Sequence, residues 1–92
     1  MWRKSLTDGT GRWFDAETAE LIGKIQRDNV RGQYEEHLWF TPNGVYVLEK
    51  LNYENSECYR DCKEVKSVEA ATWLSENDFE TPEWFDRHLK QI

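Results

Sequence analysis

The feature of this sequence that most constrains its fold is a turn signal at residues 41–44, Thr-Pro-Asn-Gly, between two segments rich in apolar and aromatic residues. Proline presets the first corner of a type I turn, and glycine supplies the left-handed position of a three-residue hairpin loop with a bulge at Gly44. We therefore expect an antiparallel hairpin over residues 35–51. Its register pairs Thr41 with Val45, Phe40 with Tyr46, Trp39 with Val47, Leu38 with Leu48, His37 with Glu49 and Glu36 with Lys50.

The two faces of this hairpin carry different residues. One face has the apolar residues expected beneath a helix: Leu38, Phe40, Tyr46 and Leu48. The other face is also apolar at its centre, where it carries Trp39, Val45 and Val47. A solvated face of an antiparallel sheet should be mostly polar. Either another part of the chain covers this second face, or it is a contact surface for a partner.

The segment before the hairpin fits two structures. Residues 16–26 could form a helix capped by Asp15, with Ala19, Ile22 and Ile25 as its apolar stripe. Gly23 would cost such a helix about 1 kcal/mol. We therefore favour a turn at 15–19 followed by a strand at 20–26, and we expect a loop at 28–33.

The segment after the hairpin is polar until a helix signal appears. We expect a long turn over residues 52–63, a short strand at 64–66 and a helix that Ser67 caps and Asn77 ends. The apolar stripe of that helix is Val68, Ala70, Ala71, Trp73 and Leu74. Thr81-Pro82-Glu83 predicts the start of a second helix. Its buried side would be Trp84, Phe85, Leu89 and Ile92.

These elements predict a single α+β domain. Ninety-two residues are enough for one domain. We expect a small antiparallel sheet of three or four strands, built around the 35–51 hairpin and packed by one or two C-terminal helices. Residues 1–11 contain two glycines and no periodicity, so they predict a flexible lead-in to a domain over residues 12–92.

The composition narrows the classes of partner. The formal net charge is −6, and an acidic domain is a poor match for nucleic acid but a good match for a basic protein surface. No apolar run approaches the roughly 20 residues of a membrane span. The two cysteines do not form the framework of a disulfide-rich secreted protein. We expect a cytoplasmic protein whose partner is another protein, with no direct contact to nucleic acid or membrane.

Three segments together resemble a family of small bacterial and phage proteins. Residues 13–23, Trp-Phe-Asp-Ala-Glu-Thr-Ala-Glu-Leu-Ile-Gly, are similar to its opening motif Y/F-D-T-E-T-A-x-x-I-G. Residues 35–48 are similar to its motif E-E-x-L-Y-x-T-x-x-G-x-x-F-L, and residues 67–74 to its helix L-S/T-x-E-E-A-x-x-W. The resemblance covers most of residues 12–90. It implies a small antiparallel sheet with one or two helices and no catalytic residues.

This chain departs from the family pattern after Leu48. The family continues there into a Gly-Glu-Gly-Gly loop, whereas residues 49–52 of this chain are Glu-Lys-Leu-Asn. A role that depends on that loop is therefore not expected here.

The cysteines and histidines provide little basis for catalysis or metal binding. Cys58 and Cys62 would share a face only if their segment were helical, and a structural zinc site needs four ligands. The two histidines, His37 and His88, have no zinc-finger spacing to these cysteines. No nucleophile motif or phosphate-binding glycine loop is present. We expect no enzymatic activity and no cofactor, and we keep a Cys58/Cys62 metal or redox switch as an alternative.

These observations predict a non-enzymatic acidic binding protein of a phage or other mobile element. By analogy with anti-CRISPR proteins, it would inhibit a host protein that handles nucleic acid by blocking a basic surface. The expected contact residues are an apolar patch and two acidic segments: Trp39, Val45, Val47, Glu54, Glu57, Asp61, Glu76, Asp78, Glu80, Glu83 and Asp86. The alternative is a homo-oligomer, such as a homodimer, in which the face that carries Trp39, Val45 and Val47 packs against the same face of a second copy across a two-fold axis.

Overall fold

The predicted turn at residues 42–44 joins β4 (Gly32–Phe40) to β5 (Tyr46–Glu54). The amide of Gly44 donates a hydrogen bond of 2.9 Å to the carbonyl oxygen of Thr41. Gly44 has a φ of +79°, in the left-handed region that favours glycine. The predicted register is confirmed along the whole hairpin.

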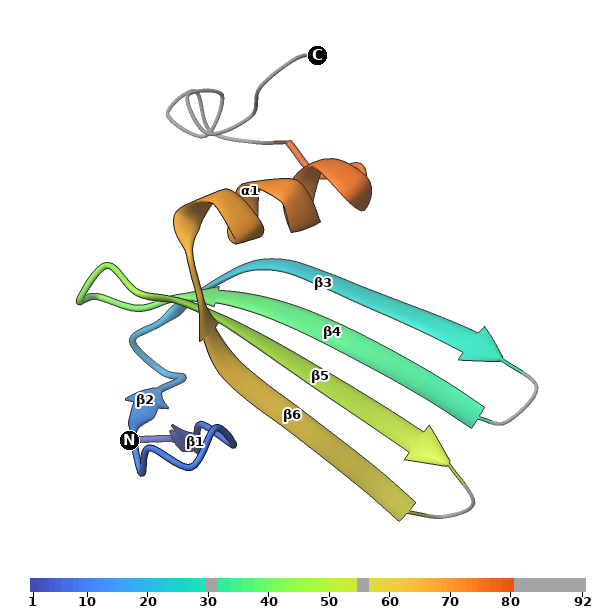
Figure 1. The fold of residues 1–92 in the computed structure, drawn as a ribbon, viewed down its shortest axis with the longest axis horizontal. Coiled ribbons are helices and arrows are strands. Elements are labelled where there is room, and N and C mark those ends of the chain that lie inside the picture. The colour runs from blue at the N-terminus through green and yellow to red at the C-terminus, as the bar shows by residue number, and fades with distance from the viewer. Residues whose placement is uncertain (30–31, 55–56, 81–92) are drawn as a thin grey trace.

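The structure is a computed structural model that describes residues 1–29, 32–54 and 57–80. The remaining elements of this part of the chain are β1 (Arg3–Ser5), β2 (Trp13–Asp15), β3 (Glu20–Asn29), β6 (Glu57–Val65) and α1 (Ser67–Glu76) (Figure 1). Strands β3, β4, β5 and β6 form one antiparallel sheet in that order, and β1 pairs with β2 in a second one. The predicted α+β class is confirmed. The second predicted helix, from Thr81 onward, lies outside the described residues.

The strands extend further than the sequence indicates. The strand alternative for residues 16–26 is confirmed, because β3 begins at Glu20 after a turn. However, β3 continues to Asn29 and β4 begins at Gly32, so the loop predicted at 28–33 is wrong. The long turn predicted at 52–63 is also wrong, because β5 and β6 occupy most of it. These strand ends are polar on both faces of the sheet, so no alternation of polar and apolar residues marks them in the sequence. Their backbone N–H and C=O groups are satisfied by cross-strand pairing alone.

Helix α1 lies over one face of the four-stranded sheet, near the end that holds the β4–β5 turn (Figure 1). Its buried residues pack on a core in which Leu38 is fully buried: Ala70, Ala71, Trp73 and Leu74. The helix ends at Asn77 as predicted, but Lys66 rather than Ser67 occupies the N-cap position. Val68 is 41% exposed, so it lies outside the buried stripe in which we expected it.

Gly23 is required by this packing. A Cβ atom at this position would lie 2.8 Å from Cζ3 of Trp73, closer than such contacts normally occur. The indole of Trp73 therefore rests directly on the backbone of β3, and it stacks on Phe79 with ring centroids 5.5 Å apart. The glycine that argued against a helix at 16–26 is thus explained by the approach of α1.

The N-terminal residues cover the opposite face of the sheet. The sequence predicted a flexible lead-in over residues 1–11, but Arg3–Ser5 forms β1 and pairs with β2. A second core lies between this small hairpin and the sheet: Phe14, Ala16, Trp39, Val47 and Cys62. Low propensity did not prevent strand formation, because pairing with β2 and contact with the sheet compensate for it. In the described residues, no helix is long and apolar enough to span a membrane.

Candidate protein-binding face

Cross-strand register assigns each side chain of the four-stranded sheet to one of two faces. We call the face that packs on α1 the helix side; it includes Leu38 and its cross-strand partners Gly23 and Leu48. We call the opposite face the hairpin side, because β1 and β2 cover it; it includes Trp39 and Val47. Side chains that are directly opposite on neighbouring strands share a face.

The hairpin side contains a buried carboxylate, Glu49, which has an exposed fraction of 0%. One of its oxygens accepts hydrogen bonds from His37 Nδ1 at 3.2 Å and from Trp39 Nε1 at 3.3 Å. The other accepts hydrogen bonds from Lys4 Nζ at 3.1 Å and from Arg60 Nε at 2.8 Å. A buried charge of this kind is tolerated only when it is paired and hydrogen-bonded. The predicted pairing of His37 with Glu49 is confirmed.

Opposing effects determine the protonation of Glu49. Burial raises the pKa of its carboxyl group, but hydrogen bonds and charge from Arg60 and Lys4 outweigh burial and leave the pKa below its ordinary value. The other ring nitrogen of His37 lies 3.1 Å from Glu35 Oε2. The network links β1, β4, β5 and β6, and its side chains enclose the carboxylate of Glu49, which is 0% exposed. We therefore assign it a structural role.

The residues predicted to form an apolar contact patch lie beneath or beside the N-terminal hairpin. Trp39 and Val47 are buried, with exposed fractions of 7% and 2%, and the Phe14 ring packs on Trp39 at 5.6 Å between centroids. Of the two alternatives that the sequence left open, the structure shows that the chain covers this face itself. Val45 and Val47 do line an open groove of about 640 Å³ beside Trp13. A homo-oligomer centred on Trp39 would require displacement of Phe14.

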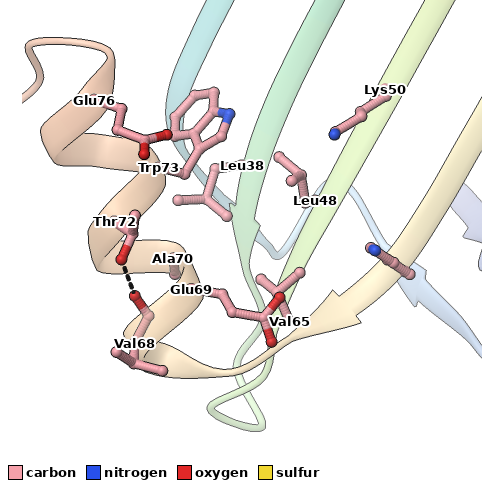
Figure 2. Close-up of a pocket in the computed structure, with 11 residues that line it drawn as sticks. Leu38, Leu48, Lys50, Val65, Val68, Glu69, Ala70, Thr72, Trp73 and Glu76 are labelled. Carbon is pink, nitrogen blue, oxygen red and sulfur yellow. Dashed lines mark hydrogen bonds between the residues drawn. The ribbon is translucent and has the colours of Figure 1, made fainter. Parts of the chain in front are cut away.

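The helix side holds a smaller groove of about 310 Å³ between α1 and the sheet. Leu38, Leu48 and Val65 form its floor, and Trp73 forms part of its helical wall (Figure 2). Its charged lining residues are Lys50, Lys63, Glu69 and Glu76. Trp73 Nε1 donates a hydrogen bond of 2.5 Å to Glu36 Oε2, which fixes the indole against β4. The volume lies at the lower end of the range for ligand pockets.

Beyond this groove the sheet extends past α1, as Figure 1 shows. The free end carries residues that we call the tyrosine tip: Tyr34, Tyr53, Glu54, Glu57 and Tyr59. Tyr53 and Tyr59 are 40% and 56% exposed, and the Tyr59 hydroxyl donates to Glu57. Register places Tyr34 and Tyr59 in one cross-strand row of the helix side, with Asn52 between them. Exposed tyrosines of this kind are typical of protein-binding surfaces.

The structure brings several of the predicted acidic residues onto the helix side. Glu54 and Glu57 are a cross-strand pair at the tyrosine tip, Asp61 is opposite Lys50, and Glu76 lines the groove at α1. Asp78 and Glu80 are exposed and follow α1, whereas Glu83 and Asp86 lie outside the described residues. Among the described residues, the basic side chains on this face are Arg27, Lys50 and Lys63, and the carboxylates outnumber them: Glu20, Glu36, Glu54, Glu57, Asp61, Glu69 and Glu76.

Cys58 and Cys62 lie on one strand, β6, rather than on a helix. Four residues along a strand span about 13 Å, which is too far for a disulfide bond or a shared metal ligand set. Cys58 is exposed and Cys62 is buried. In the residues that the structure describes, no cluster of three or more potential metal ligands occurs. The geometry therefore does not support a switch formed by these two thiols together.

Sequence reasoning missed the tyrosine tip because it assigned residues 52–63 to a turn. The available signal was weak: Tyr53 and Tyr59 flank the polar stretch Glu-Asn-Ser-Glu-Cys, in which no periodicity marks a strand. It also missed the part of Lys4 and Arg60 in the Glu49 network, since these contacts join residues far apart in sequence. Only the local member of that network, His37, was predictable from hairpin register.

The fold and these surfaces define a small α+β domain that exposes an acidic, tyrosine-containing end of its sheet. Comparison with protein families, with curated proteins and with solved structures finds no match to this chain. The resemblance to a family of small bacterial and phage proteins therefore stays a prediction.

Proposed function

We propose that this chain is a non-enzymatic binding protein that uses the helix side of its sheet to cover a basic surface of another protein. The observation that carries the proposal is the tyrosine tip, where Tyr59 is 56% exposed on the helix side, on the same face as Glu54 and Glu57. Tyr53, which is 40% exposed, lies at the same end of the sheet on the hairpin side. Aromatic side chains supply contact area at low entropic cost, and acidic neighbours select a basic partner.

The charge of this face supports a protein partner over nucleic acid. Carboxylates outnumber cations on the helix side, and the whole chain has a net charge of −6. A phosphate backbone would be repelled by such a surface. A protein that binds nucleic acid presents clustered Lys and Arg, to which this face is complementary. The mode of action would then be competition for that basic site, as in the anti-CRISPR analogy.

The test is retention of heparin-binding proteins on the immobilised domain. A heparin-enriched bacterial extract supplies proteins with basic surfaces, and we expect the wild-type domain to retain a subset that raised salt releases. The double substitution Glu54→Lys/Glu57→Lys should abolish this retention, and Tyr59→Ala should weaken it about tenfold or more. A retained protein should also lose its nucleic-acid binding when the wild-type domain is added.

A matched control separates the tyrosine tip from net charge. Glu17→Lys/Glu20→Lys changes the charge by the same amount at the opposite end of the sheet, where Glu20 is paired with Phe40. This variant should retain most of the same proteins. Equal retention by the tip variant and the wild type, or equal loss in both double variants, would overturn the assignment of the tyrosine tip as the contact surface.

A further inference from the structure

The two outer strands of the four-stranded sheet differ in how their edges are protected. The β6 edge is closed at Cys62 by Thr7: the Thr7 amide donates to the Cys62 carbonyl at 2.7 Å, and the Cys62 amide donates to Thr7 Oγ1 at 2.7 Å. Among the described residues, the outer edge of β3 has no such backbone partner. An open edge strand is a template for pairing with another strand.

Strand β3 is long and regular enough to accept a partner. It covers ten residues, and its one irregularity is a bulge between Leu21 and Gly23. From Gly23 to Asn29 its register with β4 is unbroken. Lys24, Gln26 and Asp28 are exposed and alternate with residues of the helix side. They therefore share the hairpin side of the sheet.

We propose that β3 pairs antiparallel with β3 of a second copy, so that two sheets join into one across a two-fold axis. This surface is distinct from the tyrosine tip and does not depend on the function proposed above. The charge pattern of β3 selects the register. Residues that are directly opposite each other in an antiparallel pair must share a face of the sheet. The two-fold axis must therefore pass where one residue of β3 is opposite the same residue of the second copy.

Charge discriminates among the possible centres. A centre at Lys24, Arg27 or Asp28 places identical charges opposite each other, which is unfavourable. A centre at Ile25 creates no charge pair. A centre at Gln26 places Lys24 of each copy opposite Asp28 of the other, which creates two complementary pairs on one face. The same register places Arg27 opposite the half-buried Ile25. Within the regular segment from Gly23 to Asn29, the charges of β3 are therefore complementary to those of its own reversed copy only in this register.

The test is the mass of the full chain in solution, measured by size-exclusion chromatography with light scattering from micromolar to millimolar concentration. We expect the wild type to reach twice the monomer mass as concentration rises. Lys24→Glu alone and Asp28→Lys alone should each remain monomeric, because each substitution makes both cross-strand pairs repulsive. The double variant Lys24→Glu/Asp28→Lys should dimerise again, because it reverses both pairs together.

Mixing the two single variants gives an independent check. The Lys24→Glu chain and the Asp28→Lys chain are complementary at both pairs, so an equimolar mixture should form a heterodimer although neither variant dimerises alone. Circular dichroism of each variant confirms that the domain is folded. A wild type that stays monomeric throughout, or a dimer that both single variants retain, would overturn the proposal.

Discussion

Lys4 donates a hydrogen bond of 3.1 Å to Glu49, a carboxylate 45 residues away that is completely buried in the sheet. Arg60 donates to the same oxygen at 2.8 Å. These two cations connect the N-terminal strand β1, the central strand β5 and the edge strand β6 through one side chain. The N-terminal hairpin is therefore held to the sheet by charge as well as by the Phe14 and Trp39 contact.

Removal of the buried carboxylate should be strongly destabilising. We expect Glu49→Ala to lower the free energy of unfolding by about 3–5 kcal/mol, because it leaves buried cationic and polar donors without their acceptor. Urea unfolding followed by tryptophan fluorescence measures this difference. Lys4→Met is the matched control: it removes one donor of several and should cost less than half as much. A loss below about 1 kcal/mol for Glu49→Ala would contradict the structural role of the network.

The same carboxylate predicts a dependence of stability on pH. The pKa of Glu49 is lower in the folded protein than its ordinary value of 4.5, so the unfolded chain takes up the proton first as the pH falls. Its contribution to stability is complete above about pH 4.5 and is lost as the pH falls through the folded pKa. Urea unfolding between about pH 6 and about pH 3 should show a steeper acid loss in the wild type than in Glu49→Gln. Parallel curves for the two proteins would refute this.

The two thiols should differ sharply in reactivity. Burial raises the pKa of Cys62 to about 11, and its side chain is enclosed in the core with Phe14 and Trp39. Cys58 is exposed. Because the thiolate is the reactive form, a thiol reagent at neutral pH should modify Cys58 quickly and Cys62 only after unfolding. Labelling of Cys58→Ser and Cys62→Ser, with and without urea, distinguishes the two sites by mass spectrometry. Rapid native labelling of the Cys58→Ser variant would contradict the burial of Cys62.

The contact between Gly23 and Trp73 should be sensitive to a single methyl group. We expect Gly23→Ala to destabilise the domain by about 1–3 kcal/mol, since its Cβ would overlap the indole and lift α1 from β3. Thermal unfolding measures the change. The penalty should shrink in a Trp73→Leu background, where the ring is absent. Equal penalties in both backgrounds would mean that the indole does not cause the effect.

The central part of the fold was predictable because its signals are local. The turn at Pro42, the pairing of His37 with Glu49 and the helix end at Asn77 all depend on residues close in sequence. The covering of the hairpin side was not predictable, because β1 has little strand propensity and the contacts that hold β1 and β2 on the sheet join residues far apart in sequence. The apolar residues around Trp39 indicated that this face is either covered by another part of the chain or used to contact a partner. The periodicity of the sequence cannot distinguish these two outcomes.

Only the acidic residues of the candidate site were predictable from the sequence; the tyrosines beside them were not. The sequence identified Glu54, Glu57 and Asp61 as an acidic group, and the structure places them on one face of the sheet. It did not identify Tyr53 and Tyr59 as their neighbours, since a polar strand with two solvated faces has no periodic signal. Conversely, Trp39 was chosen for its apolar surroundings and is covered by the N-terminal hairpin.

The two bonds between Thr7 and Cys62 also bear on the size of any assembly. A sheet with two open edge strands can add further copies at both edges and form a fibre. A sheet with one open edge strand can pair with only one other copy and forms a dimer. Because the N-terminal segment blocks the β6 edge at Cys62, a strand of another copy could not pair along the whole of β6. Pairing through β3 meets no such block in the described sheet, so it would favour a closed pair of two chains. Loss of the hydrogen bonds between Thr7 and Cys62 should therefore favour larger aggregates over the dimer.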